Sequence, residues 1–326
     1  MALAVMALLD WEGHPFDVDM AFLEGDVAEN LYVKLPDGYR DSLNQVGRLQ
    51  KAMYGLIHVG LLWSNKFGGE LIAKGFERSH ADPCVFRRKH LGKVVVTIVV
   101  YVDDLLVLRN EAGRASGAGG PRSSFIIKNL GELSYYLGCH ITRDRKARTV
   151  LFDQQRYAQT VTERFDTHRA HARQVRAAVP ETDGEPRGDI WRRDGATENA
   201  MKLSAWVDAD HATCPDTRRS VSGGAAMLGG GAISWFLRAH RVTATATSES
   251  EYAALAEIVN ELRFLRQVKA FMIPPIDYNI RVHDDNEGAI KMPENRFSSR
   301  RTRHIDVKHH MVRDALDGGI TRVGYV

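Results

Sequence analysis

Two adjacent carboxylates stand inside a long apolar run. The stretch VVVTIVVYVDDLLVL, residues 94–108, places Asp103 and Asp104 among β-branched and aliphatic residues. Neighbouring side chains of a strand point to opposite faces, so one uninterrupted strand would bury a carboxylate at a cost of several kcal/mol. We therefore predict two strands, over 94–101 and 105–108, joined by a tight turn that brings both carboxylates to one solvent pocket.

An Asp-Asp pair by itself is also ordinary turn chemistry, because Asp is a common turn former. A metal site needs a third carboxylate, and Asp17 in HPFDVDMAFLEGD stands at the end of a predicted strand. Three carboxylates at one point would suit Mg²⁺, and two such ions would activate an attacking oxygen and stabilise a leaving one. The spacing equally allows Asp17 to belong to an exposed acidic stretch.

The elements that must position these acids alternate along the first half of the chain. We predict an initial helix in MALAVMALLD, a strand near 16–19, a strand in LYVKL and a helix in LLWSNKFGGELIAKGF. The Asp-Asp hairpin follows, then a second hairpin within 133–152 and a helix in QQRYAQTVTERF. The stretches 110–124 and 166–200 are small, polar and weakly periodic, which predicts loosely packed loop or linker.

The second half reads as three strands, a helix, a strand and further helix. The strands are predicted in KLSAWVDAD, SVSGGAAML, AISWFL and YNIRVHDD. The first helix is indicated by helical spacing of five apolar residues: Leu255, Ile258, Val259, Leu262 and Leu265. This order predicts an α/β arrangement with an antiparallel start.

Composition sets the outer limits. At 326 residues with 44% hydrophobic and 26% charged residues, the chain is globular and long enough for about two domains. No apolar run reaches a membrane-spanning length, and the first residues lack the basic region and cleavage site of a signal peptide. Cys84, Cys139 and Cys214 are odd in number and widely spaced, which argues against a disulfide framework or a zinc cluster. We expect an intracellular protein.

Six ordered motifs carry a family resemblance. FDVDMAFLEGDV, LYVKLPDGY, RLQKAMYGL, GFERSHADPCVF, YVDDLLVL and LGELSYYLG resemble the palm motifs of copia-type long-terminal-repeat retrotransposon reverse transcriptases. The resemblance implies that Asp17, Asp103 and Asp104 are the catalytic metal-binding triad of an RNA-directed DNA polymerase. It also implies that Phe22 lies beneath the incoming sugar and disfavours a 2′-hydroxyl, although Phe22 could equally be a core aromatic.

The second half resembles the ribonuclease H domain of the same polyproteins through WVDADHA, DTRRSVSG, GGGAISW, SESEYAALAE, DDNEGAI and RTRHIDVKHH. The resemblance implies that Asp208, Glu251 and Asp285 hold two Mg²⁺ ions, or Mn²⁺, around a scissile RNA phosphate, with Asp306 or His304 as a further ligand. Structural alternatives stay open: Asp208 could be a strand-end acid, Ser248 and Glu251 fit a capping box, and Asp285 could cap the following helix.

A basic segment, ENRFSSRRTRHIDVKHH, favours phosphate contacts or a solvated charged face about equally. Its proposed substrate-binding residues are Arg300, Arg301 and Arg303.

The chain departs from the family pattern in several places. It begins just upstream of the first palm motif, so we expect the fingers to be missing. Relatives continue YGL with Lys-Gln-Ala-Pro-Arg, whereas residues 57–61 here are IHVGL, which removes two cations. The stretch RNEAGRASGAGGPRSS replaces a charged amphipathic helix, and 166–200 does not resemble the thumb and connection.

The resemblance thus implies an α+β fold class: a palm with an antiparallel sheet and helices over 1–165, a linker over 166–200 and an α/β ribonuclease H-like domain over 201–326. The implied substrates are an RNA template, deoxynucleoside triphosphates and RNA–DNA hybrid, in a cytoplasmic particle or the nucleus. The alternatives are a non-catalytic nucleic-acid-binding remnant, attracted to phosphates by the basic segment, and a pseudogene product that does not fold stably. Any surviving activity is expected to be ribonuclease H, and sequence leaves the oligomeric state undetermined.

Overall fold

The chain forms two compact units, which are described one at a time. The first unit is Trp11–Leu137, and the second is Met1–Asp10 with Gly138–Val326. The predicted sequence domains, divided at 165 and 201, stay a prediction. The computed structural model describes residues 1–36, 38–39, 45–115, 125–146, 149–164, 189–192, 201–212, 216–240, 246–273, 279–294 and 306–326.

An antiparallel sheet of six strands, in the order β4-β5-β6-β7-β1-β8, organises the first unit. Its strands are β1 (Glu12–Val18), β4 (Glu77–Arg78), β5 (Val85–His90), β6 (Lys93–Tyr101), β7 (Asp104–Arg109) and β8 (Ile127–Asn129). The unit's remaining elements are η1 (Ala21–Glu24), β2 (Tyr32–Lys34), β3 (Val46–Arg48), α2 (Val59–Ala73), α3 (Glu111–Ala115) and β9 (Tyr135–Tyr136). The predicted strand-turn-strand reading of 94–108 is confirmed by β6 and β7.

Helix α2 closes the core of this unit. Its buried side chains Trp63, Phe67 and Leu71 belong to one apolar cluster with Phe86 and Ile98 of the sheet. The Trp63 and Phe67 rings stack with centroids 5.0 Å apart. Burial of these large side chains holds the β6–β7 hairpin against helix α2.

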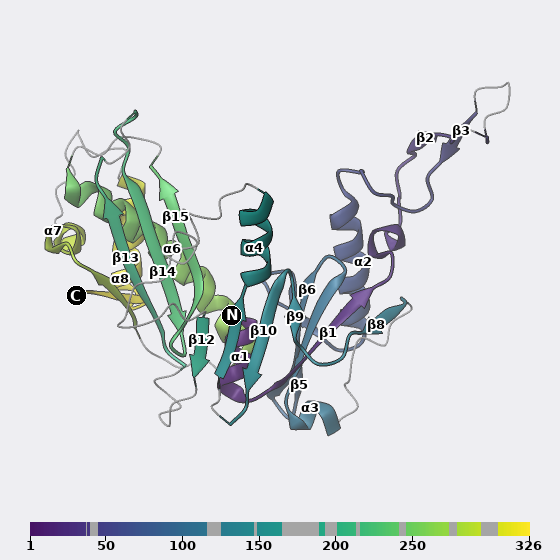
Figure 1. Cartoon of the computed structure of the whole chain (residues 1–326), viewed down its shortest axis with the longest axis horizontal. Coiled ribbons are helices and arrows are strands. Elements are labelled where there is room, and N and C mark those ends of the chain that lie inside the picture. Colours follow the sequence, from purple (N-terminus) through teal and green to yellow (C-terminus); the bar gives the residue numbers. More distant parts are fainter. Residues whose placement is uncertain are drawn as a thin grey trace. The chain divides into compact units, whose positions relative to one another are not determined.

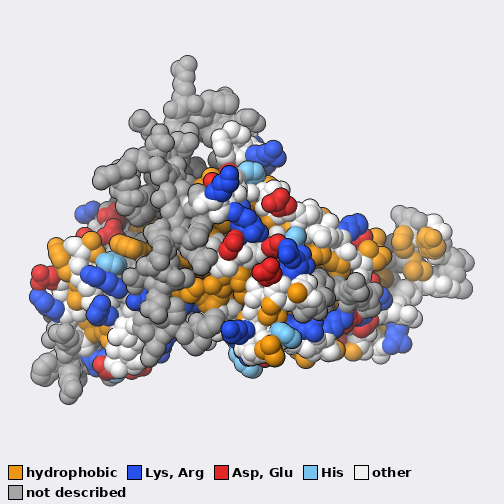
Figure 2. All heavy atoms as spheres, turned by 90° about the horizontal axis from the view of Figure 1, so that it is seen from below, with side chains coloured by type: hydrophobic (Ala, Val, Ile, Leu, Met, Phe, Trp, Pro, Cys, Tyr) orange, Lys and Arg blue, Asp and Glu red, His pale blue; other side chains and the backbone are white. Residues whose placement is uncertain are grey.

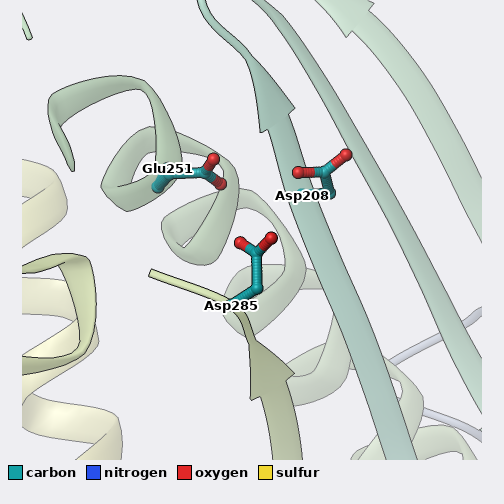
Figure 3. A group of neighbouring side chains, drawn as sticks. All are labelled: Asp208, Glu251 and Asp285. Atoms are coloured by element: carbon teal, nitrogen blue, oxygen red, sulfur yellow. The ribbon is translucent and has the colours of Figure 1, made fainter. Parts of the chain in front are cut away.

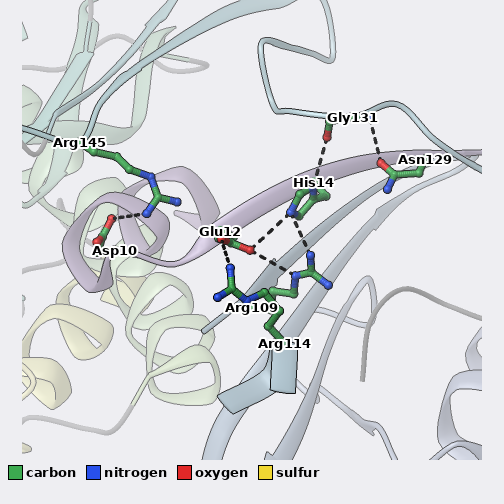
Figure 4. A network of polar contacts seen from close by, with 8 residues as sticks. All are labelled: Asp10, Glu12, His14, Arg109, Arg114, Asn129, Gly131 and Arg145. Carbon is green, nitrogen blue, oxygen red and sulfur yellow. Dashed lines mark hydrogen bonds and ion pairs between the residues drawn. The ribbon is translucent and has the colours of Figure 1, made fainter. Parts of the chain in front are cut away.

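Polar contacts at one end of the sheet fix the register of β1 against β7 (Figure 4). Glu12 pairs with Arg109 of β7 at 3.6 Å and with Arg114 of α3 at 3.2 Å. His14 lies 3.3 Å from Arg109 and 3.2 Å from the Gly131 carbonyl oxygen. A slip of one residue would turn every β1 side chain to the other face, so this network supports the alignment of the strand's functional end.

The second unit begins with a helix, α1 (Ala2–Leu9), that the sequence predicted. It is apolar all round and buried, as expected for a helix that lies inside a core. Strands β10 (Cys139–Asp144), β11 (Thr149–Asp153) and β12 (Asp189–Arg192) pair antiparallel beside it, and α4 (Gln155–Arg164) follows β11. The predicted hairpin within 133–152 is therefore present as β10 and β11.

A mixed sheet of five strands, in the order β15-β14-β13-β16-β17, forms the rest of this unit. The pairs β13–β14 and β14–β15 are antiparallel, whereas β13–β16 and β16–β17 are parallel. Figure 1 shows α6 packed along this sheet. The strands are β13 (Leu203–Asp210), β14 (Val221–Leu228), β15 (Gly231–Ala239), β16 (Ile280–Asp284) and β17 (Thr321–Tyr325), and the helices are α6 (Thr247–Met272), α7 (Glu287–Lys291), η2 (Met292–Glu294) and α8 (Asp306–Asp317).

The two stretches predicted as loop contain secondary structure in their described parts. Helix α3 occupies the start of 110–124, and Gly113 in it lies so close to β6 that an added Cβ would meet the Val95 carbonyl oxygen at 2.4 Å. Strand β12 lies within 166–200 and completes the sheet with β11. The loop prediction was wrong at these places, because a glycine can serve close packing and a short strand can be fixed by its pairing partner. The remainder of both stretches lies outside the described residues.

The surface mixes charges of both signs. On the face shown in Figure 2, Lys and Arg side chains are interspersed with Asp, Glu and apolar side chains among the described residues. Within the same described part of the chain, no helix is long and apolar enough to span a membrane.

Candidate active sites

The first acidic site lies where β1 and β7 meet. In the antiparallel register Asp17 is directly opposite Asp104, and Asp104 also pairs with Tyr101 across the hairpin. Asp103 occupies the two-residue turn between β6 and β7. Chain segments far apart in sequence therefore deliver the three predicted carboxylates to one end of the sheet.

The turn that carries Asp103 is held in an uncommon conformation. Val102 has φ of 58°, in the left-handed region that β-branched residues rarely adopt. Trp63 on α2 donates a hydrogen bond from Nε1 to the Val102 carbonyl oxygen at 2.6 Å, and the Val18 amide donates to the Asp103 carbonyl oxygen at 2.9 Å. Backbone strain that surrounding contacts enforce in this way is typical of functional sites.

The carboxylates act on one another electrostatically. Burial raises the pKa of Asp104, and the charges of Asp103 and Asp17 raise it further. Two neighbouring residues escaped the sequence analysis. The Tyr136 hydroxyl is buried without a hydrogen-bond partner among the described residues, and burial followed by the Asp104 charge raises its pKa. Lys128 pairs with Asp19 at 2.6 Å. Tyr136 stands in the quoted motif LGELSYYLG but was given no role, whereas Lys128 reaches the site only through the long-range pairing of β8 with β1.

Phe22 lies on η1, directly after β1. Its ring packs partly against the core cluster and meets the Tyr54 ring edge-on, with centroids 5.4 Å apart. The half-buried placement leaves part of the ring accessible. The structure is thus compatible with both readings of Phe22, a core aromatic and a platform beside the acids.

The second acidic site is more compact (Figure 3). Asp208 of β13, Glu251 of α6 and Asp285, which follows β16, point toward one another. One ligand oxygen from each lies within 4.8 Å of the other two. Within the described residues, these three form the one group of possible metal ligands whose atoms all lie this close together.

Neither of the two capping roles, for Glu251 or for Asp285, is present in the structure. Helix α6 begins at Thr247 with Ala246 as the N-cap, so Ser248 lies inside the helix and forms no capping box with Glu251. The cap of α7 is Asn286, whose side chain accepts a hydrogen bond from the Ala289 amide at 3.0 Å. Asp285 therefore does not cap that helix, and both carboxylates stay available to the cluster.

Ionising Glu251 costs free energy when no cation is present. Burial raises the pKa of Glu251 to about 8, and the charges of Asp208, Asp284 and Asp285 raise it further. The Glu251 Oε2 atom is buried and has no hydrogen-bond partner among the described residues. A hydrogen bond with the Ala209 backbone favours the charged form of Glu251, and a nearby cation would favour it further.

A fourth acid, Asp284, was missed by the sequence analysis, although its neighbour in VHDD was identified. It is fully buried, and burial raises its pKa to about 6. Its Oδ1 atom accepts a hydrogen bond from the Asn286 amide at 2.9 Å, whereas Oδ2 has no partner within the described part of the chain. Strand alternation points Asp284 inward with Ile280 and Val282, so only tertiary packing reveals its proximity to the cluster.

Several predicted residues cannot be placed. Arg300, Arg301, Arg303 and His304 lie outside the described residues. Asp306 begins α8, but its side chain also lies outside what the structure describes. The basic segment and the further ligand stay predictions.

The sheets and helices of the two units make a mixed α+β protein, which confirms the predicted fold class. Each unit also carries a group of carboxylates. The family model described as "Reverse transcriptase (RNA-dependent DNA polymerase)" matches residues 1–177, more than half of the chain. The chain belongs to the reverse transcriptase family.

Its curated relatives are retrotransposon polyproteins, as predicted. The Retrovirus-related Pol polyprotein from transposon TNT 1-94 of Nicotiana tabacum is 27% identical over 97% of this chain and 29% of the relative. That from transposon RE1 of Arabidopsis thaliana is 25% identical over 100% of this chain and 26% of the relative. The chain therefore spans less than a third of the length of these relatives.

Among solved structures, RNase H1 from the halophilic archaeon Halobacterium salinarum aligns with a TM-score of 0.28 and 14% identity. The alignment covers 38% of this chain and 85% of that one.

Proposed function

We propose that this chain is a piece of a retrotransposon polyprotein whose second unit hydrolyses the RNA strand of an RNA–DNA hybrid. The first unit is the palm of the associated RNA-directed DNA polymerase, which uses deoxynucleoside triphosphates. The observation that carries the hydrolase is the convergence of Asp208, Glu251 and Asp285 within 4.8 Å from three separate elements.

The residues of the second site fit divalent cations. All three donors are carboxylates, the ligands that Mg²⁺ prefers and that Mn²⁺ also accepts. A cation at this point would compensate the mutual repulsion of the acids and the buried Glu251 Oε2, which has no hydrogen-bond partner among the described residues. When bound, two ions would activate the attacking oxygen and stabilise the leaving oxygen of the scissile phosphate.

The protein's own contribution is to hold these side chains still. Asp208 and Asp285 are exposed and face the approaching substrate, whereas Glu251 is buried on α6 behind them. Asn286 fixes the backbone after Asp285 through its cap to Ala289 and its amide hydrogen bond to Asp284. Such preorganisation matters because misplacement by about 1 Å can cost on the order of a hundredfold in rate.

Polymerisation has a weaker basis in this chain. The opposition of Asp17 and Asp104 supplies carboxylates for two ions, and Phe22 lies on η1, which follows the strand that carries Asp17. The segment after YGL, however, offers Ile57 and Leu61 as exposed apolar residues where relatives carry cations. A polymerase site that lacks these two cations should position a triphosphate poorly, so we propose hydrolysis as the surviving activity.

The test is an assay of the purified chain on hybrid with labelled RNA in Mg²⁺. Asp208→Asn is expected to abolish release of RNA fragments. Asp210→Asn is the matched control, because Asp210 is exposed on the same face of β13, two residues further on, and is expected to retain activity within a few-fold. Cleavage by the Asp208→Asn variant at the wild-type rate, or no cleavage at all together with robust primer extension, would refute the proposal.

A non-catalytic nucleic-acid-binding remnant is the second candidate, favoured by the exposed apolar residues after YGL. It predicts hybrid binding that is unchanged by Asp208→Asn, with no turnover in Mg²⁺ or Mn²⁺. The same two assays on the same preparations separate the candidates.

A further inference from the structure

The five-stranded sheet of the second unit has one face against which no described helix packs. Helix α6 lies on the face formed by Leu203, Ala205 and Val207, which are buried. Alternate residues of β13 point the other way, and among them Trp206 is 39% exposed. We call this other side of the sheet the open face.

Aromatic side chains cross the open face in a single row. The strand registers align four residues from neighbouring strands: His283, Trp206, Ala225 and Trp235. The rings of Trp206 and His283 stack at 4.7 Å with an interplanar angle of 9°. Trp235 is 54% exposed on the edge strand β15. Tryptophan is usually largely buried in a folded protein, so two accessible ones in one row call for a partner.

The spacing of the row suits separated flat rings. Trp206 and Trp235 are two strands apart, which corresponds to about 10 Å. Only the methyl group of Ala225 stands between them, so the floor between the rings is shallow. Exposed aromatics on neighbouring strands of a sheet are a common way to stack unpaired bases.

Two arginines lie on the open face beside the row. Arg281 of β16 and Arg322 of β17 are aligned in the parallel register, and both are exposed. Arg281 lies two residues from His283 and therefore on the same face, and its side chain passes over Gly324, where an added Cβ would lie 3.7 Å from Nε. Asp208 and Asp210 follow Trp206 along β13, on the other side of the row from Arg281, so positive charge borders the row on one side and acids border it on the other.

We propose that the open face binds single-stranded nucleic acid. One base stacks on Trp235 and another on the Trp206–His283 pair, while Arg281 and Arg322 contact backbone phosphates. This role goes beyond hybrid hydrolysis and does not require it, because none of these side chains belongs to the acidic cluster. A protein partner is the competing occupant, and the paired arginines beside flat aromatic rings favour the polyanion.

The experiment measures binding of fluorescein-labelled oligodeoxythymidine to the full chain by anisotropy, in EDTA so that no catalytic ion contributes. Trp235→Ala is expected to weaken binding about tenfold. Phe264→Ala is the matched control, because Phe264 is a 41% exposed aromatic on α6, and it is expected to bind as wild type. Circular dichroism of both variants verifies that they fold.

The arginines are tested by salt dependence. The slope of log affinity against log salt concentration is expected to fall by about 0.7 for each of Arg281→Gln and Arg322→Gln. An unchanged slope in both variants, equal affinity of Trp235→Ala and Phe264→Ala, or no binding by wild type would overturn the proposal. Self-association that Trp235→Ala abolishes, without nucleic-acid binding, would assign the face to a protein partner instead. Hybrid cleavage by Trp235→Ala is measured in parallel, so that loss of the open face and loss of the hydrolase are distinguished.

Discussion

Asp17 of β1 lies directly opposite Asp104 of β7 in the antiparallel ladder. Like charges in opposite positions destabilise a sheet, and here Asp103 adds a third charge at the adjoining turn. The arrangement is maintained by contacts elsewhere, including the Glu12 network at the far end of the same strands. The first unit therefore holds a repulsive triad in place before any cation binds.

Replacing Asp104 should relieve that repulsion. Burial raises the pKa of Asp104, followed by the charges of Asp103 and Asp17, so its ionisation at neutral pH works against the fold. In EDTA, Asp104→Asn is expected to stabilise the first unit by about 0.2–1 kcal/mol in urea denaturation. Mg²⁺ should then stabilise wild type more than the variant. Asp19→Asn, which loses the pair with Lys128, should not be stabilising.

The indole of Trp63 is expected to be a main support of the hairpin turn. It is 1% exposed and donates to the Val102 carbonyl oxygen at 2.6 Å. Trp63→Phe removes the donor and some packing, which should cost about 1–3 kcal/mol in urea denaturation of the first unit. Tyr101→Phe, which deletes an exposed hydroxyl on the same hairpin, is the control and should change stability by less than about 0.5 kcal/mol. Equal stability of the two variants would contradict the role of Trp63.

Gly113 is expected to be required for α3 to pack on β6. An added Cβ would lie 2.4 Å from the Val95 carbonyl oxygen, which is backbone and cannot rotate away. Gly113→Ala should therefore destabilise the first unit by about 1–3 kcal/mol. Gly69 in α2 has no atom within 4 Å of its added Cβ, so Gly69→Ala should stabilise by about 0.5–1 kcal/mol. Opposite signs for the same chemical change in two helices would test the close packing directly.

The second site predicts a pH dependence of stability. Burial raises the pKa of Glu251 in the folded chain to about 8, well above its ordinary value, so folding favours the neutral form. The stability that protonation of Glu251 contributes is fully present at pH values below its pKa in the unfolded chain. This stability is lost as the pH rises through the pKa in the folded chain. In EDTA, the melting temperature of the second unit should fall between about pH 5 and 8. Glu251→Gln should flatten that slope, whereas Glu287→Gln at an exposed position should not.

Cation binding should reverse the same dependence. Because carboxylate ligands must be deprotonated, Mg²⁺ binding at neutral pH should release a proton from Glu251. The calorimetric enthalpy of binding is then expected to vary with the ionisation enthalpy of the buffer, and Glu251→Gln should lose that variation. An enthalpy independent of buffer in wild type would argue against Glu251 as a ligand.

Local patterns in the sequence determined several features of this protein. Two carboxylates within a run of β-branched residues leave one low-cost solution, a hairpin with the acids near its turn, and β6 and β7 adopt it. The apolar first residues form a buried helix. The ordered motifs identified the family, because each retains several residues of a local pattern.

Only the tertiary structure decided how distant residues meet. The opposition of Asp17 and Asp104, the burial of Asp284 and the row from His283 to Trp235 all depend on strand registers between remote segments. The capping reading of Glu251 failed for a related reason, since α6 begins before Ser248. Short-range propensities are small compared with the free energy of burying apolar faces. That burial, summed over the whole chain, selects the register and thereby the positions of the carboxylates and the exposed rings.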